Sequence, residues 1–192
     1  IAISVIGLIS RLYNSTSKIQ REKVFNLDDQ AIIGLAVNGA HIMQRCAEEQ
    51  AETMWTFEYT PESFTATEPE FALEICNAVG KVWQPTAEHP VIFNLPSTVE
   101  NTTPNIYADR IEWFSQHINN REGIILSVHT HNDRGSAIAS AELAILAGAQ
   151  RVEGTLLGNG ERTGNTDLLV MAMNRPFFGT ADPCSVPISF FS

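Results

Sequence analysis

The sequence lacks any run of 18 apolar residues and any signal-peptide pattern at its start, so we expect a cytoplasmic protein without a membrane span. Positive charge is scarce: 12 Lys and Arg face 22 Asp and Glu, and the formal net charge is -10. Such an acidic chain is not expected to bind nucleic acid or an anionic membrane broadly. A local basic pocket for an anionic substrate stays open.

Cysteine is also rare. Cys46, Cys76 and Cys184 are far apart and form no C-x-x-C pair, which fits a reducing compartment better than a disulfide framework. Cys46 and Cys76 lie in helical patterns, where we expect buried thiols. The composition, 44% apolar and 18% charged, is that of a globular domain.

Short β-branched or aromatic runs alternate with helical patterns along the chain. The runs predict strands near residues 2–10, 53–60, 91–97, 123–131 and 151–158. A polar loop follows the first run, and a helix is then predicted over residues 29–50. The second helix begins after an N-cap at Thr67 with Glu70 as its partner, and the third begins at Thr103-Pro104. The fourth ends at Gly148, and the fifth begins near Thr166.

Repeated strand and helix with near-continuous apolar strands predicts an α/β fold with a parallel sheet covered by helices. The glycine-rich turn follows the fifth strand rather than the first, which argues against an open dinucleotide-binding sheet. We therefore expect a partial (β/α)₈ TIM barrel, with about five C-terminal units present and the leading units missing. Residues 1–174 would form this part of the barrel, and residues 175–192 a divergent tail.

Polar residues follow every predicted strand, as expected where the loops of a barrel converge on one site. His129 and His131 lie two residues apart on a strand, so both side chains face one side and could hold one metal ion. A pair of rim histidines bonded to carboxylates is the alternative. A third ligand could come from Asn165 or from a carboxylate in the missing units.

Three further loops carry candidate residues. Glu62 could reach the barrel mouth as a base or an orienting acid, and Thr98 could hold a substrate carboxylate, although a surface acid and ordinary turn chemistry are the alternatives. Gly158 and Gly160 would let the backbone approach a ligand closely, next to the charge of Glu161. A tight turn with a salt bridge at the rim is the alternative for this segment.

Four spaced motifs together resemble the 2-isopropylmalate synthases, most closely the longer, actinobacterial and fungal type. The motifs are YNSTSKIQREKVF, FEYTPESFTATEPEFALEICNAV, NLPSTVENTTPN and SVHTHNDRGSAIASAELAILAGAQRVEGTLLGNGERTGN. The resemblance implies a divalent-metal-dependent (Zn, Mg or Mn) Claisen-type condensation of acetyl-CoA with 2-oxoisovalerate in leucine synthesis. It also implies a homodimer in the full-length protein.

By matching motif positions, the resemblance implies that His129, His131 and Asn165 lie at the metal. Thr98 would bind the oxo-acid carboxylate, and Glu62 and Glu161 would be active-site acids. Arg11, a candidate substrate-binding residue, stands where the family usually has His, and the family's Arg-Asp-Gly motif is absent.

Three alternatives remain. Homocitrate or citramalate synthases share the metal loop but use another oxo acid. Amidohydrolases also carry His-x-His, but on their first strand. A barrel fragment kept as a binding or assembly module would not be an enzyme.

Overall fold

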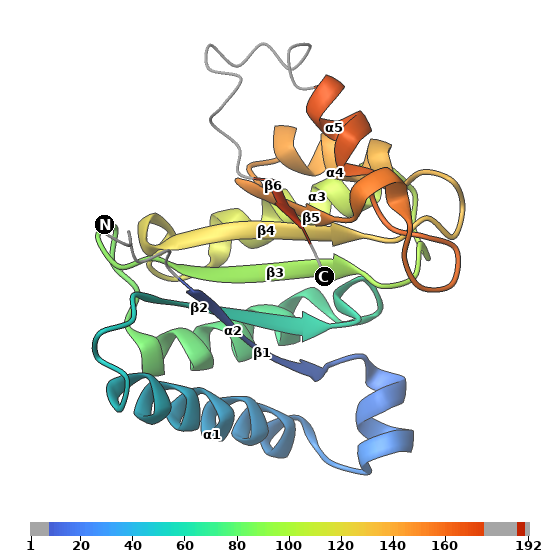
Figure 1. The fold of residues 1–192 in the computed structure, drawn as a ribbon. Helices are drawn as coiled ribbons and strands as arrows, with labels where there is room; N and C mark the ends of the chain where they lie inside the picture. The colour runs from blue at the N-terminus through green and yellow to red at the C-terminus, as the bar shows by residue number, and fades with distance from the viewer. Residues whose placement is uncertain (1–7, 175–187, 191–192) are drawn as a thin grey trace, which may run out of the picture.

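The computed structural model describes residues 8–174 and 188–190, and its six strands form one parallel sheet in chain order, β1 to β6 (Figure 1). The strands are β1 (Leu8–Ser15), β2 (Trp55–Glu62), β3 (Val91–Ser97), β4 (Ile124–Thr130), β5 (Arg151–Gly154) and β6 (Ile188–Phe190). The α-helices are α1 (Asp29–Glu48), α2 (Pro69–Trp83), α3 (Pro104–His117), α4 (Ala137–Leu146) and α5 (Leu168–Asn174). Short helical turns are η1 (Gln20–Phe25), η2 (Phe64–Ala66), η3 (Arg121–Gly123) and η4 (Leu156–Gly158).

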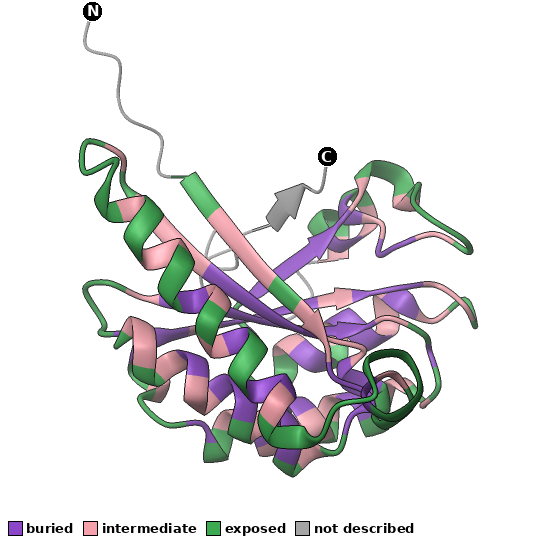
Figure 2. Cartoon of the chain, turned by 90° about the horizontal axis from the view of Figure 1, so that it is seen from below, coloured by how far each residue is buried: buried purple, intermediate pink, exposed green. Residues whose placement is uncertain are grey.

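The helices α1 to α4 form a layer on one face of the sheet, each packed against the next (Figures 1 and 2). Strands that follow chain order, without the reversal of a doubly wound sheet, are what a barrel requires. The predicted α/β fold with a parallel sheet is confirmed, and the arrangement is consistent with part of a barrel.

The hydrophobic core fills the space between this helix layer and the sheet. Tyr59 of β2, Phe93 of β3 and Leu126 of β4 point to the helix side of the sheet, as every second residue of a strand does. All three side chains are fully buried in the core. Tyr107 of α3 is also buried, and its hydroxyl donates a hydrogen bond of 2.5 Å to the Leu95 carbonyl oxygen. One face of β2, β3 and β4 is thereby occupied by core packing, so polar side chains are left to the other face.

Several predicted boundaries are wrong. The first strand extends through Ser15, and β2 extends through Glu62, so residues expected in loops lie within strands; residues 2–7 of the first predicted run lie outside the described residues. Part of the polar loop after the first strand forms η1. Glu68, not Thr67, is the N-cap of α2, because the Thr67 hydroxyl instead donates to the Ser63 carbonyl oxygen at 2.9 Å.

Other boundaries are confirmed. Thr103 and Pro104 are the N-cap and first residue of α3, and Gly148 follows the end of α4 with a φ of 104°. Cys76 is buried as expected, whereas Cys46 is exposed, and Cys184 lies outside the described residues. β6, which pairs with β5, lies in the tail where no strand was expected. Among the described helices, none is long and apolar enough to cross a membrane.

The edge strand β1 pairs only with β2 among the described residues, and its Ile9 is 46% exposed. Unpaired strand edges promote association. We therefore expect the isolated 192-residue chain to self-associate, and Ile9→Lys to reduce that association in sedimentation velocity. The matched control is Leu35→Lys on α1, where the leucine is 47% exposed but lies away from the edge. A monodisperse wild-type monomer, or equal effects of both variants, would contradict this prediction.

Candidate active site

The face of the sheet opposite the helices carries polar side chains from five neighbouring strands. Because side chains alternate, Arg11 lies opposite Leu12, Glu58 opposite Tyr59, and His129 opposite Val128. The strand register places Arg11 beside Glu58 and His129 beside Glu153. This face, called the polar face below, holds the candidate site.

A pocket of about 460 Å³ opens on the polar face at the carboxyl ends of the strands. Most residues predicted for the site line it: Arg11, Glu62, His129, His131, Glu161 and Asn165. Thr98, Gly158 and Gly160 are not among its lining residues. Tyr13, Thr60, Asn94 and Pro96 also line the pocket and were not predicted, although their period-two spacing along the strands is visible in the sequence.

The two histidines of the strand end lie side by side, with ring centroids 4.9 Å apart. The pKa of His129 is lowered to about 3, first by burial and then by His131 and the guanidinium groups of Arg11 and Arg151. The pKa of His131 is also lowered, chiefly by burial. Both imidazoles are therefore neutral at neutral pH, which is the form that binds metals.

His131 and Asn165 form an isolated bridge, and each carries a buried side-chain atom without a hydrogen-bond partner: His131 Nδ1 and Asn165 Oδ1. Buried polar atoms normally have a partner, so these two atoms fit a site that receives a ligand. With His129 they provide imidazole and amide-oxygen donors that suit a divalent ion. Among the described residues, no group of three or more His, Cys, Asp or Glu is arranged so that it could hold a metal ion by itself.

The glycine-rich turn after β5 holds Asn165 in this position. Gly158 accepts a hydrogen bond from the Asn165 backbone N–H at 3.0 Å and has a φ of 69°. A Cβ at position 160 would collide with the Asn165 side chain. The close approach that these glycines permit is therefore an approach to Asn165. Arg162 forms an ion pair of 2.6 Å with Asp133 beside the turn. A salt bridge of this kind is what the alternative interpretation of this segment expected.

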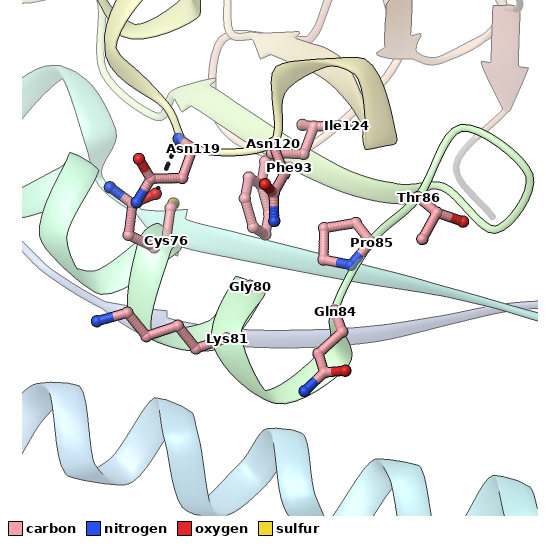
Figure 3. A pocket seen from close by; sticks show the side chains of 11 residues that line it. Cys76, Gly80, Lys81, Gln84, Pro85, Thr86, Phe93, Asn119, Asn120 and Ile124 are labelled. Atoms are coloured by element: carbon pink, nitrogen blue, oxygen red, sulfur yellow. Dashed lines mark hydrogen bonds between the residues drawn. The ribbon is translucent and has the colours of Figure 1, made fainter.

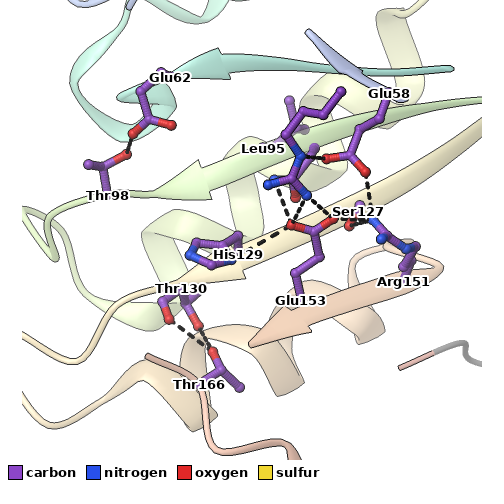
Figure 4. A network of polar contacts seen from close by, with 12 residues as sticks. Glu58, Glu62, Leu95, Thr98, Ser127, His129, Thr130, Arg151, Glu153 and Thr166 are labelled. Carbon is purple, nitrogen blue, oxygen red and sulfur yellow. Dashed lines mark hydrogen bonds and ion pairs between the residues drawn. The ribbon is translucent and has the colours of Figure 1, made fainter. Parts of the chain in front are cut away.

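Glu62, the last residue of β2, is oriented by the next loop. The Thr98 hydroxyl donates a hydrogen bond of 2.5 Å to Glu62 Oε1 and accepts one of 3.2 Å from the Ser63 backbone N–H (Figure 4). Ser63 adopts a left-handed conformation with a φ of 66°. The geometry thus connects Thr98 to the pocket through Glu62.

Deeper in the polar face, the buried side chains of Glu58, Arg151 and Glu153 lie together (Figure 4). With Arg11, which is 26% exposed, they form a four-charge cluster. Arg11 Nε lies 2.6 Å from Glu58, and Arg11 Nη2 lies 2.7 Å from Glu153. Arg151 contacts both carboxylates, whose side chains are 0% exposed. Arg11 is therefore paired on both sides. The sequence interpretation missed this cluster, although charges at alternate positions of apolar strands were its signal.

The two carboxylates of the cluster perturb each other. The pKa of Glu58 is raised from 4.5 to about 7, chiefly because burial disfavours the charged form and secondly because Glu153 lies close, while Arg11 and Arg151 oppose the shift. The folded protein therefore retains a proton that the unfolded chain releases at lower pH. This contribution to stability is present below about pH 4.5 and is lost as the pH rises through about 7.

Glu58→Gln removes this titration. We expect the urea midpoint of the variant to rise relative to wild type as the pH increases from about 4.5 to about 7. Glu88→Gln, at an exposed glutamate, is the control and should show a constant difference from wild type. A difference for Glu58→Gln that does not depend on pH would contradict the prediction.

A larger cavity, of about 640 Å³, lies at the other end of the strands between α2 and the amino ends of β3 and β4 (Figure 3). Its lining combines amide side chains such as Asn77 and Asn120 with Lys81 and the buried thiol of Cys76. None of the predicted site residues lies there. Barrel enzymes place their chemistry at the carboxyl ends of the strands, so the smaller pocket is the candidate active site.

The fold and the pocket define a class. Parallel strands in chain order, helices on one face and histidines at the carboxyl ends of the strands are the arrangement of (β/α)₈-barrel enzymes. The chain belongs to the HMGL-like family, whose model matches residues 9–181.

Known proteins agree with this assignment. The chain is 59% identical over 166 residues to 2-isopropylmalate synthase of Pseudomonas fluorescens (strain SBW25), covering 86% of this chain and 30% of the relative. It is 55% identical over 166 residues to 2-isopropylmalate synthase of Ralstonia nicotianae, covering 86% and 29%. The resemblance drawn from the motifs is confirmed. The chain spans about 30% of the length of these relatives.

Solved structures support the fold. An HMG-CoA lyase from Acinetobacter baumannii, in complex with coenzyme A and 3-methylmalate, superposes with a TM-score of 0.63 at 14% identity, covering 94% of this chain and 55% of that one. The N-terminal domain of a putative aldolase from Bacteroides vulgatus gives a TM-score of 0.54 at 18% identity, covering 94% and 59%.

Proposed function

We propose that this chain is part of the catalytic barrel of a 2-isopropylmalate synthase, which condenses acetyl-CoA with 2-oxoisovalerate to give 2-isopropylmalate and CoA. The observation that carries the proposal is the pocket in which His129, His131 and Asn165 meet two carboxylic acids, in a chain 59% identical to such a synthase. Residues 1–174 would be the C-terminal part of a barrel whose leading units belong to the same polypeptide.

His129, His131 and Asn165 are the residues of this chain that would hold a divalent ion, and a carboxylate from the leading units would complete the site. When bound, the ion supplies Lewis-acid polarisation of the oxo-acid carbonyl. Zn²⁺, Mg²⁺ and Mn²⁺ are all compatible with mixed imidazole and oxygen donors. Arg11 and the polar residues Thr60 and Asn94 line the floor against which the oxo acid would bind.

Glu62 and Glu161 are the acids placed to handle protons in this pocket. One base removes a proton from the methyl group of acetyl-CoA, and the resulting enolate carbon bonds to the ketone carbon of the oxo acid. The ketone oxygen then takes a proton, and water cleaves the thioester to release CoA. The Thr98 hydroxyl donates its one proton to Glu62 Oε1 at 2.5 Å and so orients that acid. To bind the substrate carboxylate, Thr98 would have to give up this hydrogen bond.

The rest of the protein follows from the same proposal. The polypeptide would act in the cytosol as a homodimer on small-molecule substrates, with acetyl-CoA as co-substrate. Homocitrate and citramalate synthases carry out the same reaction class with other oxo acids. Substrate choice therefore separates these activities.

The metal site gives the first test of the function. We expect the complete polypeptide to bind one divalent ion per chain, and His129→Ala with His131→Ala to abolish binding, because these changes remove both imidazole donors. Elemental analysis after gel filtration measures the metal content. His41→Ala with His89→Ala removes two exposed histidines and should leave it unchanged. Equal metal content in both double variants would refute the site.

The oxo acid gives the second test. CoA release from acetyl-CoA, followed with a thiol reagent, should be at least about tenfold faster with 2-oxoisovalerate than with 2-oxoglutarate or pyruvate, which corresponds to about 1.4 kcal/mol of discrimination. Faster release with 2-oxoglutarate would identify a homocitrate synthase, and faster release with pyruvate a citramalate synthase. No release with any oxo acid from a metal-loaded protein would favour a binding module.

A further inference from the structure

The carboxylate of Glu153 lies at the centre of the polar face with partners on three other residues of the sheet. Arg11 Nη2 donates to its oxygens at 2.8 and 2.7 Å, Asn94 Nδ2 donates at 3.2 Å, and Arg151 Nη1 also donates to it. These partners come from β1, β3 and β5. The side chain is 0% exposed, so Glu153 is fixed by hydrogen bonds from several strands.

Glu153 Oε2 also lies 3.7 Å from Nδ1 of His129 (Figure 4). The two residues are partners in the register of β4 and β5, so the strand pairing itself sets this contact. At 3.7 Å the contact is longer than a hydrogen bond, and a buried anion at this distance favours an N–H, rather than a lone pair, on the nitrogen that faces it.

We infer that Glu153 is a positioning residue that holds His129 in the tautomer with its proton on Nδ1. The lone pair is then on Nε2, the nitrogen on the far side of the ring from Glu153. A metal-binding histidine commonly orients its second ring nitrogen toward a carboxylate in this way. The inference rests on the proposed metal site for its consequence, but the tautomer is a property of the protein without metal.

The arginines of the four-charge cluster follow from this role. A lone carboxylate at 0% exposure is costly to bury, and Arg11 and Arg151 offset that cost through direct ion pairs. Glu58 lies in the same cluster and pairs with the same arginines, whereas the 3.7 Å ion-pair contact with His129 is made by Glu153. Glu58→Gln therefore serves as the comparison variant for Glu153→Gln, because it changes the charge of the same cluster and leaves the 3.7 Å contact in place.

The first measurement is the tautomer of His129. The complete polypeptide is labelled with ¹⁵N-histidine, freed of metal, and observed by long-range ¹H–¹⁵N NMR, with His129 assigned by the signals lost in His129→Ala. We expect the Nδ1–H tautomer in wild type and in Glu58→Gln, and its loss in Glu153→Gln. Glu153→Asp, which keeps the charge on a shorter side chain, should retain the tautomer in part.

The second measurement is the affinity for Zn²⁺ by calorimetric titration. Glu153→Gln should bind Zn²⁺ about 10- to 100-fold more weakly than wild type, and Glu58→Gln within about threefold of wild type. Equal weakening in both variants, or an unchanged tautomer in Glu153→Gln, would overturn the inference. If Glu153→Gln does not fold, wild-type behaviour of folded Glu153→Asp in both measurements would overturn it too. A wild-type protein that binds no metal yet shows the Nδ1–H tautomer would refute the proposed function and leave the positioning of His129 intact.

Discussion

The structure depends on the balance of charge buried in the polar face of the sheet. Two guanidinium groups, of Arg11 and Arg151, face the two carboxylates of Glu58 and Glu153, so the charges of the four-charge cluster balance when Glu58, with its raised pKa of about 7, is ionised. Removing one partner from such a set leaves an uncompensated buried charge, which is strongly destabilising. The cluster therefore connects β1, β2 and β5 across the face that would become the barrel interior.

This balance connects packing to chemistry. The helix-facing side chains, such as Tyr59 and Phe93, are fully buried and fix the position of each strand. Because side chains alternate between the two faces, the same strands then place Glu58 and Asn94 at fixed positions on the polar face. As a result, the strands supply most of the lining of the pocket at their carboxyl ends, and His131, Glu161 and Asn165 come from the segments beyond the strands.

The sequence was sufficient for the α/β fold with its parallel sheet, although several strand boundaries were wrong. Strand-helix alternation and the pair His129 and His131 depend on local periodicity, which a single sequence contains. The cluster could not be assigned in the same way, because Arg11 and Glu153 are separated by 142 positions and meet only through strand pairing. The prediction of Thr67 as an N-cap was wrong for a related reason. The Thr67 hydroxyl donates a hydrogen bond to the Ser63 carbonyl oxygen, and the helical pattern of the sequence does not reveal this contact.

The turn after β5 shows how a local sequence feature serves a distant purpose. Gly160 has no side chain because the space is occupied by that of Asn165, and Gly158 adopts a left-handed conformation while accepting a hydrogen bond from the Asn165 backbone. The turn thereby brings an amide oxygen from beyond β5 next to His131 at the end of β4. The sequence suggested that Gly158 and Gly160 let the backbone approach a ligand, whereas in the structure they let the chain approach Asn165. Because His131 Nδ1 and Asn165 Oδ1 are buried without a hydrogen-bond partner, the position in which the turn holds Asn165 fits the divalent ion proposed for this site.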